Sequence, residues 1–273
     1  MVFQWEGRAL KTFSKKLIRT LVNTAFSLVV VTLLWVIGLW AFDVSTYIGK
    51  NPMDVYNFLF TREDALANQE LVITALNQTL YDASIGFTAG IFLATLVAVL
   101  FALSKGIEQA LMPIAMLLRS VPLIAMTPII ILIFGRGNLT VAVMGAIVVL
   151  FPALVNIVFG LRSVSPAMND LVNVYGASKI KQLRTVAFPT SLPAFFAAIK
   201  ISVPGAITGA LLVEWLATGS GIGYGIVSAV GRAKANEVWA YVVVITLVSI
   251  LLYNLVALIE GYVLERFGFS KAK

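Results

Sequence analysis

Long apolar stretches separated by short polar ones dominate the pattern of the chain. A membrane core about 30 Å thick requires about 20 mostly apolar residues per helix. Six segments have this length and character: Leu21–Phe42, Leu80–Leu103, Leu111–Phe134, Thr140–Leu161, Leu192–Leu216 and Trp239–Tyr262. We therefore expect an all-α, polytopic bundle of about six transmembrane helices. Because no small-residue cleavage pattern follows the first segment, we interpret it as a retained span.

The composition supports this interpretation and excludes several kinds of chemistry. The 273 residues are 60% hydrophobic and only 12% charged, whereas a soluble domain carries about 25% charged residues. The chain contains no Cys and no His. A thiolate nucleophile, a disulfide framework, a zinc site of the usual kind and an imidazole base are therefore all excluded.

The distribution of basic residues predicts the topology. With the N-terminus in the cytoplasm, 13 Lys and Arg residues lie on the inner side and five on the outer side. The outer five are Lys50, Arg62, Arg136, Arg232 and Lys234. Because basic residues accumulate in cytoplasmic loops, we place both termini in the cytoplasm. The net charge of +7 then reflects topology and anionic inner-leaflet lipid, not nucleic-acid binding.

Prolines and charges inside the predicted spans are typical of helices that line a cavity. Prolines 113, 122 and 128 fall in the third span, and prolines 189, 193 and 204 fall at the start and in the first half of the fifth. The candidates for a translocation pathway are Arg119, Pro122, Pro128 and Glu214. Asp82 and Lys200 lie nearer the predicted span ends, where they could extend toward the membrane surface.

Two glycine patterns have structural interpretations. The pairs Gly86/Gly90 and Gly205/Gly209 have the spacing that lets helices approach closely. The alternating run from Gly219 to Gly225 follows a membrane helix rather than a strand, so it is not a nucleotide-binding fingerprint. The sequence contains no G-x-x-x-x-G-K-[ST] motif, and we assign no ATP site to this chain.

The predicted cytoplasmic loop 162–191 carries an amphipathic pattern. Ser165-Pro166 is a helix start, Gly176 interrupts the helix, and Ser178 begins a second piece that ends at Phe188-Pro189. Apolar residues recur at helical spacing: Met168, Leu171, Val172 and Tyr175. Such a bent pair either rests on lipid or docks in a groove of a soluble partner, and the pattern alone leaves both open.

The same loop resembles the cytoplasmic signature of binding-protein-dependent ABC transporter permeases. That signature is Glu-Ala-Ala, three residues, Gly, nine residues, Ile, one residue, Leu-Pro. The stretch from Asp170 to Gly176, followed by Val186 and Phe188-Pro189, keeps the complete spacing. Asp170 replaces the glutamate, and Leu171-Val172 replace the two alanines. Further stretches resemble the nitrate, sulfonate and taurine branch: 118–122, 128–135, 176–178, 213–214 and 219–225.

The resemblance implies a type I importer permease in the inner membrane of a prokaryote. Its implied partners are a cytoplasmic ATPase dimer, a second permease subunit and an extracytoplasmic binding protein that delivers a small anionic solute. ATP and magnesium would be bound by the partner ATPase, with no cofactor in this chain. The implied ATPase-coupling residues are Asp170, Leu171, Val172, Tyr175, Gly176, Ala177, Ser178, Val186 and Pro189.

Two further expectations concern the division of the chain into segments and the functions that compete with the importer function. We expect a basic N-terminus (1–20), a first helix with an extracytoplasmic segment (21–78), a permease core (79–266) and a cytoplasmic tail (267–273). The rivals are an ion-coupled secondary transporter, which needs internal acids, a membrane-embedded enzyme, which would rely on carboxylates, Ser or Lys, and a structural scaffold.

Overall fold

The computed structural model describes residues 2–269, with side chains for residues 22–117 and 119–269. Contacts divide the chain into two compact units. The first comprises the chain up to Leu76 together with the chain from Gly225 onwards, and the second is Asn77–Tyr224. Two helices, α3 (Ala65–Leu103) and α10 (Gly221–Gly231), continue across the division. The predicted boundaries near residues 20, 78 and 266 stay predictions, and residues 270–273 of the expected tail lie outside the described range.

The described chain is helical, and five helical stretches are long and apolar enough to cross a membrane. They are Val22–Ala41 within α1 (Val2–Ala41), α3, α6 (Asn138–Leu161), the composite stretch Lys179–Thr218, and α11 (Ala235–Arg266). These stretches cover five of the six predicted spans, which confirms the all-α, polytopic fold class.

The third predicted span is wrong as a single helix. The segment Leu111–Phe134 is divided between α4 (Lys105–Ser120) and α5 (Leu123–Phe134), each too short to cross a bilayer alone. Val121 and Pro122 between them adopt extended ψ angles of 125° and 122°. A residue before proline is forced out of the helical region, and proline itself has no N–H to continue the ladder. Pro113 and Pro128 remain inside the two helices.

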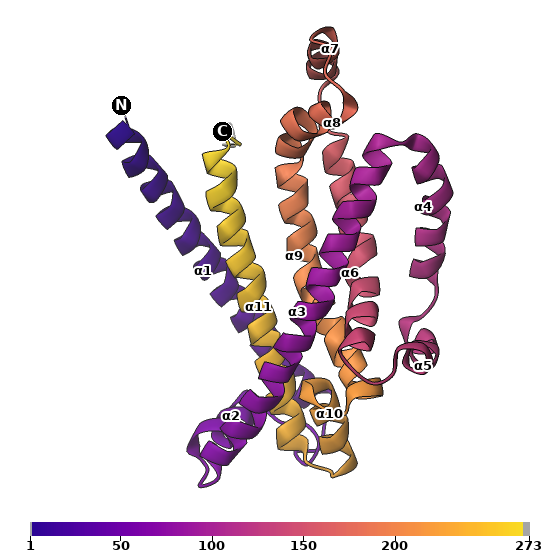
Figure 1. Ribbon diagram of the computed structural model, residues 1–273. Helices are drawn as coiled ribbons and strands as arrows, with labels where there is room; N and C mark the ends of the chain where they lie inside the picture. Colours follow the sequence, from indigo (N-terminus) through magenta and orange to yellow (C-terminus); the bar gives the residue numbers. More distant parts are fainter. Residues whose placement is uncertain (1, 270–273) are drawn as a thin grey trace. The chain divides into compact units, whose positions relative to one another are not determined.

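In the first unit, α1 packs antiparallel to α11 (Figure 1). The rings of Trp35 and Trp239 stack with centroids 5.1 Å apart, and Asn254 Nδ2 donates to Thr24 Oγ1 at 3.1 Å. The segment after α1 contains α2 (Pro52–Tyr56) and the π-helical turn η1 (Asn57–Thr61) before α3 begins. A ring stack and an interhelical hydrogen bond thus hold α1 to α11.

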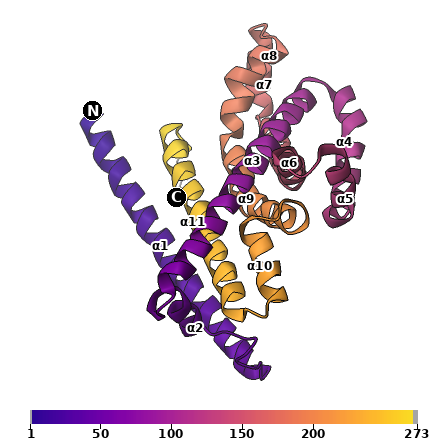
Figure 2. The ribbon, with the colours of Figure 1, turned by 60° about the horizontal axis from the view of Figure 1, so that its bottom comes forward.

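In the second unit, α3, α6 and α9 (Phe188–Val213) meet at glycines (Figures 1 and 2). A Cβ on Gly86 would lie 2.7 Å from the Gly145 Cα, and a Cβ on Gly209 would lie 3.4 Å from the same atom. The backbones of α3 and α6 touch at Gly86 and Gly145 with no space for a side chain, while α9 lies at contact distance at Gly209. The packing interpretation of Gly86/Gly90 and Gly209 is confirmed, and Gly145 is a partner that spacing along one helix could not identify.

The stretch from Lys179 to Thr218 is continuously helical, which corrects one boundary. It consists of α8 (Lys179–Gln182), the π-helical turn η2 (Leu183–Ala187), α9 and a second π-helical turn, η3 (Glu214–Thr218). Phe188-Pro189 begins α9 instead of ending the amphipathic piece. Because η2 uses longer-range bonds, with the Phe188 amide donating to the Leu183 carbonyl, the missing N–H of Pro189 falls where the ladder is already altered.

Candidate functional site

The loop 162–191 begins with a capped helix, α7 (Pro166–Val174). Ser165 Oγ accepts from the Met168 amide at 3.4 Å, and Pro166 occupies the first helical position. The predicted helix start is confirmed, since serine satisfies a free donor and proline needs none there. In both views α7 and α8 project beyond the end of α9 (Figures 1 and 2).

Gly176 ends α7 in a Schellman motif. Its φ is +66°, its amide donates to the Asn173 carbonyl at 2.9 Å, and the Ala177 amide donates to the Val172 carbonyl at 3.2 Å. This left-handed position favours glycine because a Cβ would strain the backbone. The chain then restarts at Ser178, whose Oγ accepts from the Lys181 amide at 3.4 Å. The predicted glycine corner between two helical pieces is therefore confirmed.

The face of α7 that the sequence pattern predicts as apolar is open to its surroundings. Leu171 is 52% exposed, Val174 86% and Tyr175 80%. None of the residues of α7 is buried within the described chain. Large apolar side chains this exposed usually mark a contact surface. Val174 was missed by the sequence analysis, although it lies three residues after Leu171 and so on the same helical face.

The signature residues fall into two structural groups. Asp170, Leu171, Tyr175 and Ser178 are exposed at the projecting end, while Val172 and Ala177 are half-buried. Val186 and Pro189 are also half-buried, but they belong to η2 and the start of α9. The first group can touch a partner, and the second joins the projecting end to the long helix. Their predicted role in coupling stays a prediction.

Polar contacts fix the base of the projecting end. Gln182 Nε2 donates to Asn173 Oδ1 at 2.9 Å, which ties α8 to α7. Lys179 Nζ donates to the Leu103 carbonyl at the end of α3, at 3.4 Å. Arg162 and Glu108 form an ion pair between the end of α6 and the first turn of α4. Side-chain contacts therefore join α7 to α8 and α8 to the end of α3, and a separate ion pair joins α6 to α4.

The predicted pathway residues lie on α4, α5 and η3, of which α5 packs against η3. Arg119, in the last turn of α4, stacks over the Phe151 ring of α6 with its Cζ 4.6 Å from the ring centroid. Pro122 caps the start of α5 and Pro128 lies inside it. Glu214 accepts hydrogen bonds from Thr79 and Gly223, described next. A role of these four residues in translocation stays a prediction.

Glu214 is the centre of a buried polar network. Its side chain is fully buried, and its Oε2 accepts from the Gly223 amide at 2.7 Å and from Thr79 Oγ1 at 3.0 Å. Thr79 Oγ1 in turn accepts from the Ile222 amide at 2.9 Å. A carboxylate and a hydroxyl thus satisfy the free amides at the start of α10. Thr79 was missed because nothing in its sequence surroundings marks it as a partner of a residue 135 positions away.

The alternating glycines after η3 fit around this network. A Cβ on Gly221, whose φ is +84°, would collide with the Glu214 carboxylate, and a Cβ on Gly223 would collide with the Leu211 backbone. Gly221 and Gly223 therefore let the first turn of α10 lie close to the Glu214 carboxylate and to the Leu211 backbone. This is a structural reason for glycines that the sequence analysis had only excluded from nucleotide binding.

Asp82 corrects a further expectation. Because α3 begins at Ala65, Asp82 lies well inside the helix, and it is only 1% exposed. Its Oδ1 accepts from Gln78 Nε2 at 3.0 Å. An aspartate buried in this way does not reach toward the membrane surface, so that interpretation was wrong. Lys200 is half-buried in α9, and its suggested snorkelling stays a prediction.

Comparison with known proteins gives consistent matches. A Haemophilus influenzae protein described as a probable ABC transporter permease is 29% identical over 82% of this chain and 87% of its own. The Halalkalibacterium halodurans formylaminopyrimidine transport permease is 29% identical over 72% of this chain and 79% of its own. The Bacillus subtilis putative aliphatic sulfonates transport permease is 29% identical over 73% of this chain and 74% of its own.

The family match covers the helices that build the site. Residues 86–268 match the family described as binding-protein-dependent transport system inner membrane component. This range includes α7, the Gly176 turn, the composite helix and the glycine run. The chain therefore belongs to the binding-protein-dependent transport permeases, the membrane subunits of ABC importers, and is a multi-pass membrane protein.

Proposed function

We propose that this chain is one of two permease subunits that form the pore of an ATP-driven importer in the inner membrane of a prokaryote. The observation that carries the proposal is the projecting helix α7, whose apolar face is exposed at Leu171, Val174 and Tyr175. Hydrogen bonds at its base hold it to the rest of the chain, which supports a docking role. The family membership supports this reading, because its members work with separate binding proteins.

In this proposal α7 and the Gly176 turn seat in a groove of a cytoplasmic ATPase subunit. One ATPase serves each permease copy, and ATP and magnesium are held there. Both termini then lie in the cytoplasm, on the side of α7. Coupling requires that α7 bind the ATPase differently in its open and closed states. The exposed apolar side chains supply the contact area, and the turn fixes their direction.

The composite helix offers a direct route for this movement. The stretch Lys179–Thr218 runs for 40 residues from the base of α7 to the end of η3, the turn that contains Glu214, which corresponds to about 60 Å at 1.5 Å per residue. At its far end the Glu214 carboxylate holds the start of α10 through the Gly223 amide. Beyond the Gly176 turn, a displacement of α7 therefore reaches the glycine run through continuous helix.

The proposed solute is small and anionic, and an extracytoplasmic binding protein delivers it. The likeness to the aliphatic sulfonates permease supports this class. Net transport then draws on ATP and not on an ion gradient. An ion-coupled secondary transporter is the alternative, and the buried acids Glu214 and Asp82 support it. Glu214 already accepts hydrogen bonds from two groups of its own chain, which favours a structural role.

Paired variants test the proposed docking face. Val174→Asp places a charge on the exposed apolar face, whereas Asn169→Asp places the same charge on the opposite, exposed face of α7. We expect V174D to lose ATPase co-purification and uptake into proteoliposomes while N169D keeps both. Equal behaviour of the two variants would remove the docking role. Uptake by the unmodified permease without ATPase, driven by an imposed gradient, would favour the secondary transporter.

A further inference from the structure

A pocket of about 300 Å³ lies within the first unit, between the segment that follows α1 and the turn that joins α10 to α11. Its lining includes three cations, Lys50, Arg62 and Lys234, and two carboxylates, Asp64 and Glu237. No part of the function proposed above uses it. The balance of these charges determines what the pocket can bind.

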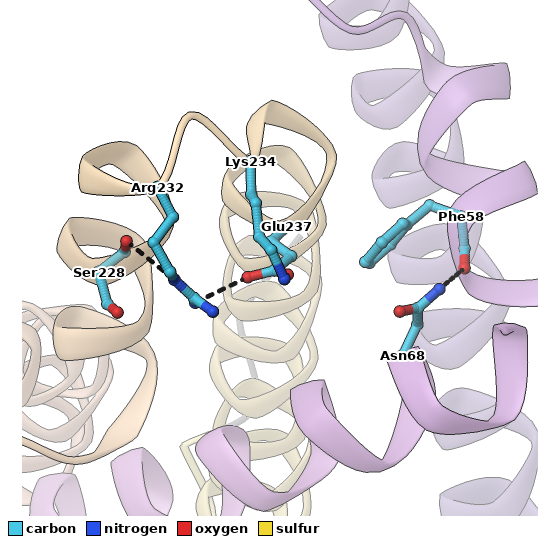
Figure 3. A network of polar contacts seen from close by, with 6 residues as sticks. All are labelled: Phe58, Asn68, Ser228, Arg232, Lys234 and Glu237. Atoms are coloured by element: carbon cyan, nitrogen blue, oxygen red, sulfur yellow. Dashed lines mark hydrogen bonds and ion pairs between the residues drawn. The ribbon is translucent and has the colours of Figure 1, made fainter.

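Glu237 is already committed to two cations. Its Oε1 accepts from Lys234 Nζ at 2.5 Å, and its Oε2 accepts from Arg232 at 3.0 Å (Figure 3). The Glu237 side chain is only 7% exposed, so it holds both cations with little access to solvent. Glu237, Lys234 and Arg232 together carry a net charge of +1. The single negative charge of Glu237 therefore does not offset the charges of Lys50 and Arg62.

Lys50 and Arg62 are held by neutral groups. Lys50 Nζ donates to the Thr46 carbonyl at 2.6 Å. With its amide oxygen turned toward Arg62, Asn236 accepts from both terminal guanidinium nitrogens, at 3.2 and 3.3 Å. The Arg62 Cζ lies 6.0 Å from the Phe58 ring centroid. Among the described residues, Asp64 is not within ion-pair distance of either cation.

The pocket floor next to Arg62 is fixed. Asn68 is buried, and its Nδ2 donates to the Phe58 carbonyl at 3.0 Å (Figure 3). This bond joins the start of α3 to η1, the turn that carries the Phe58 ring. Asn236 and this ring contact the guanidinium and position it before any ligand arrives, which lowers the entropic cost of binding.

We propose that this pocket binds a small oxyanion: a carboxylate, sulfonate or phosphate group. Uncompensated cations close together repel each other, and an anion between them relieves that repulsion. The planar guanidinium of Arg62 matches two oxygens of such a group, while Lys50 and Lys234 add point charges. The bound anion would join three segments: the chain before α2, the end of η1 and the start of α11.

A natural reporter lies beside the pocket. Trp239 Nε1 donates to the Ile48 carbonyl at 2.8 Å, and its ring stacks on Trp35. Ile48 is two residues from Lys50, and Trp239 is two residues from Glu237. An anion that orders these segments changes the surroundings of the indole. The fluorescence of Trp239 therefore reports occupancy directly, and a Trp239→Phe variant identifies its share of the signal.

The test titrates the full chain, in nanodiscs of neutral phosphatidylcholine, with sodium sulfate against sodium chloride at equal ionic strength. We expect a saturable fluorescence change with sulfate only. Arg62→Gln and Asn236→Asp should each weaken it at least about tenfold, the first by removing the guanidinium and the second by placing a carboxylate against it. Arg136→Gln, which removes an exposed cation outside the pocket, should leave it unchanged.

A second arm identifies the source of the oxyanion. In nanodiscs containing phosphatidylglycerol, a lipid headgroup in the pocket would produce the Arg62-dependent signal without sulfate, and added sulfate would then change nothing. A response to sulfate in both lipids would assign the site to a free anion. Either result supports the oxyanion site. The absence of an Arg62-dependent signal in both lipids, or an equal loss in R62Q and R136Q, would overturn it.

Discussion

The Glu214 carboxylate, in the last turns of a 40-residue helical stretch, accepts a 2.7 Å hydrogen bond from the Gly223 amide in the first turn of α10. A negative group at a helix N-terminus satisfies free amides and interacts favourably with the helix dipole. An acid at membrane depth usually indicates a functional path. Here it also has a structural reason, because it joins two consecutive helices across the glycine run.

The hydroxyl of Thr79 should contribute measurably to this junction. Thr79→Val keeps the shape of the side chain but removes the donor to Glu214 and the acceptor for the Ile222 amide. We expect a loss of about 1–3 kcal/mol in unfolding free energy, since buried polar groups lose their partner. Thr246→Val is the control, because its hydroxyl bonds only to the Val242 carbonyl on its own exposed helix face. Unfolding in mixed micelles measures both, and equal losses would contradict the network.

Alanine substitutions at two neighbouring glycines distinguish the cost of a strained backbone from the cost of a steric collision. Gly219 and Gly221 both have positive φ, but a Cβ on Gly219 meets nothing, whereas a Cβ on Gly221 meets the Glu214 carboxylate. Gly219→Ala should therefore cost only about 1–2 kcal/mol, from the left-handed backbone. Gly221→Ala should cost clearly more and lower the yield of folded protein. Thermal unfolding in detergent compares them, and similar midpoints would show that the carboxylate does not occupy this position.

Patterns of neighbouring residues predicted local structure well. They could not predict contacts between residues that are far apart in the sequence. Ser165-Pro166 and Gly176 determine their helix start and end through their own backbones, so the sequence predicted both. The partner of Glu214 is a threonine on another helix, and Gly145 meets Gly86 only after folding. The break at Pro122 was visible as a proline cluster, but apolar length alone favoured one span. Asp82 was misread because α3 begins much earlier than its apolar part.

Substitutions at Gly176 distinguish a backbone requirement from a contact requirement. Within this chain a Cβ on Gly176 meets nothing, so folding limits the position only through its φ of +66°. Asparagine tolerates this conformation better than other residues. We expect Gly176→Leu to insert normally but to abolish ATP-driven uptake. Gly176→Asn should also reduce uptake strongly if the ATPase groove covers this turn.

Membrane fractionation and proteoliposome uptake measure the Gly176 variants side by side. Full uptake by G176N with none by G176L would show that the position requires only a left-handed backbone and a side chain of limited size. Normal ATP-driven uptake by G176L would count against the coupling role of the turn.

Arg119 tests the predicted pathway. The guanidinium stacks on Phe151, so Arg119→Ala removes both a charge and a stacking contact, while Phe151→Leu removes only the stack. If the charge faces the pathway, R119A should change the uptake rate without releasing the ATPase, and F151L should have a smaller effect. Initial uptake rates at several solute concentrations measure this. Normal kinetics in R119A would leave the residue with a packing role only.

If the exposed face of α7 contacts a nucleotide-hydrolysing subunit, a thiol placed on that face should cross-link to the subunit. The composition of the chain allows this to be measured. The chain contains no cysteine, so Val174→Cys introduces a unique thiol on that face and Asn169→Cys a matched one on the opposite face. The measurement is thiol cross-linking to the ATPase in the assembled transporter, with and without ATP. We expect an ATP-sensitive cross-link from V174C and little from N169C. A V174C thiol that reacts only with lipid-soluble reagents and never with the ATPase would contradict it.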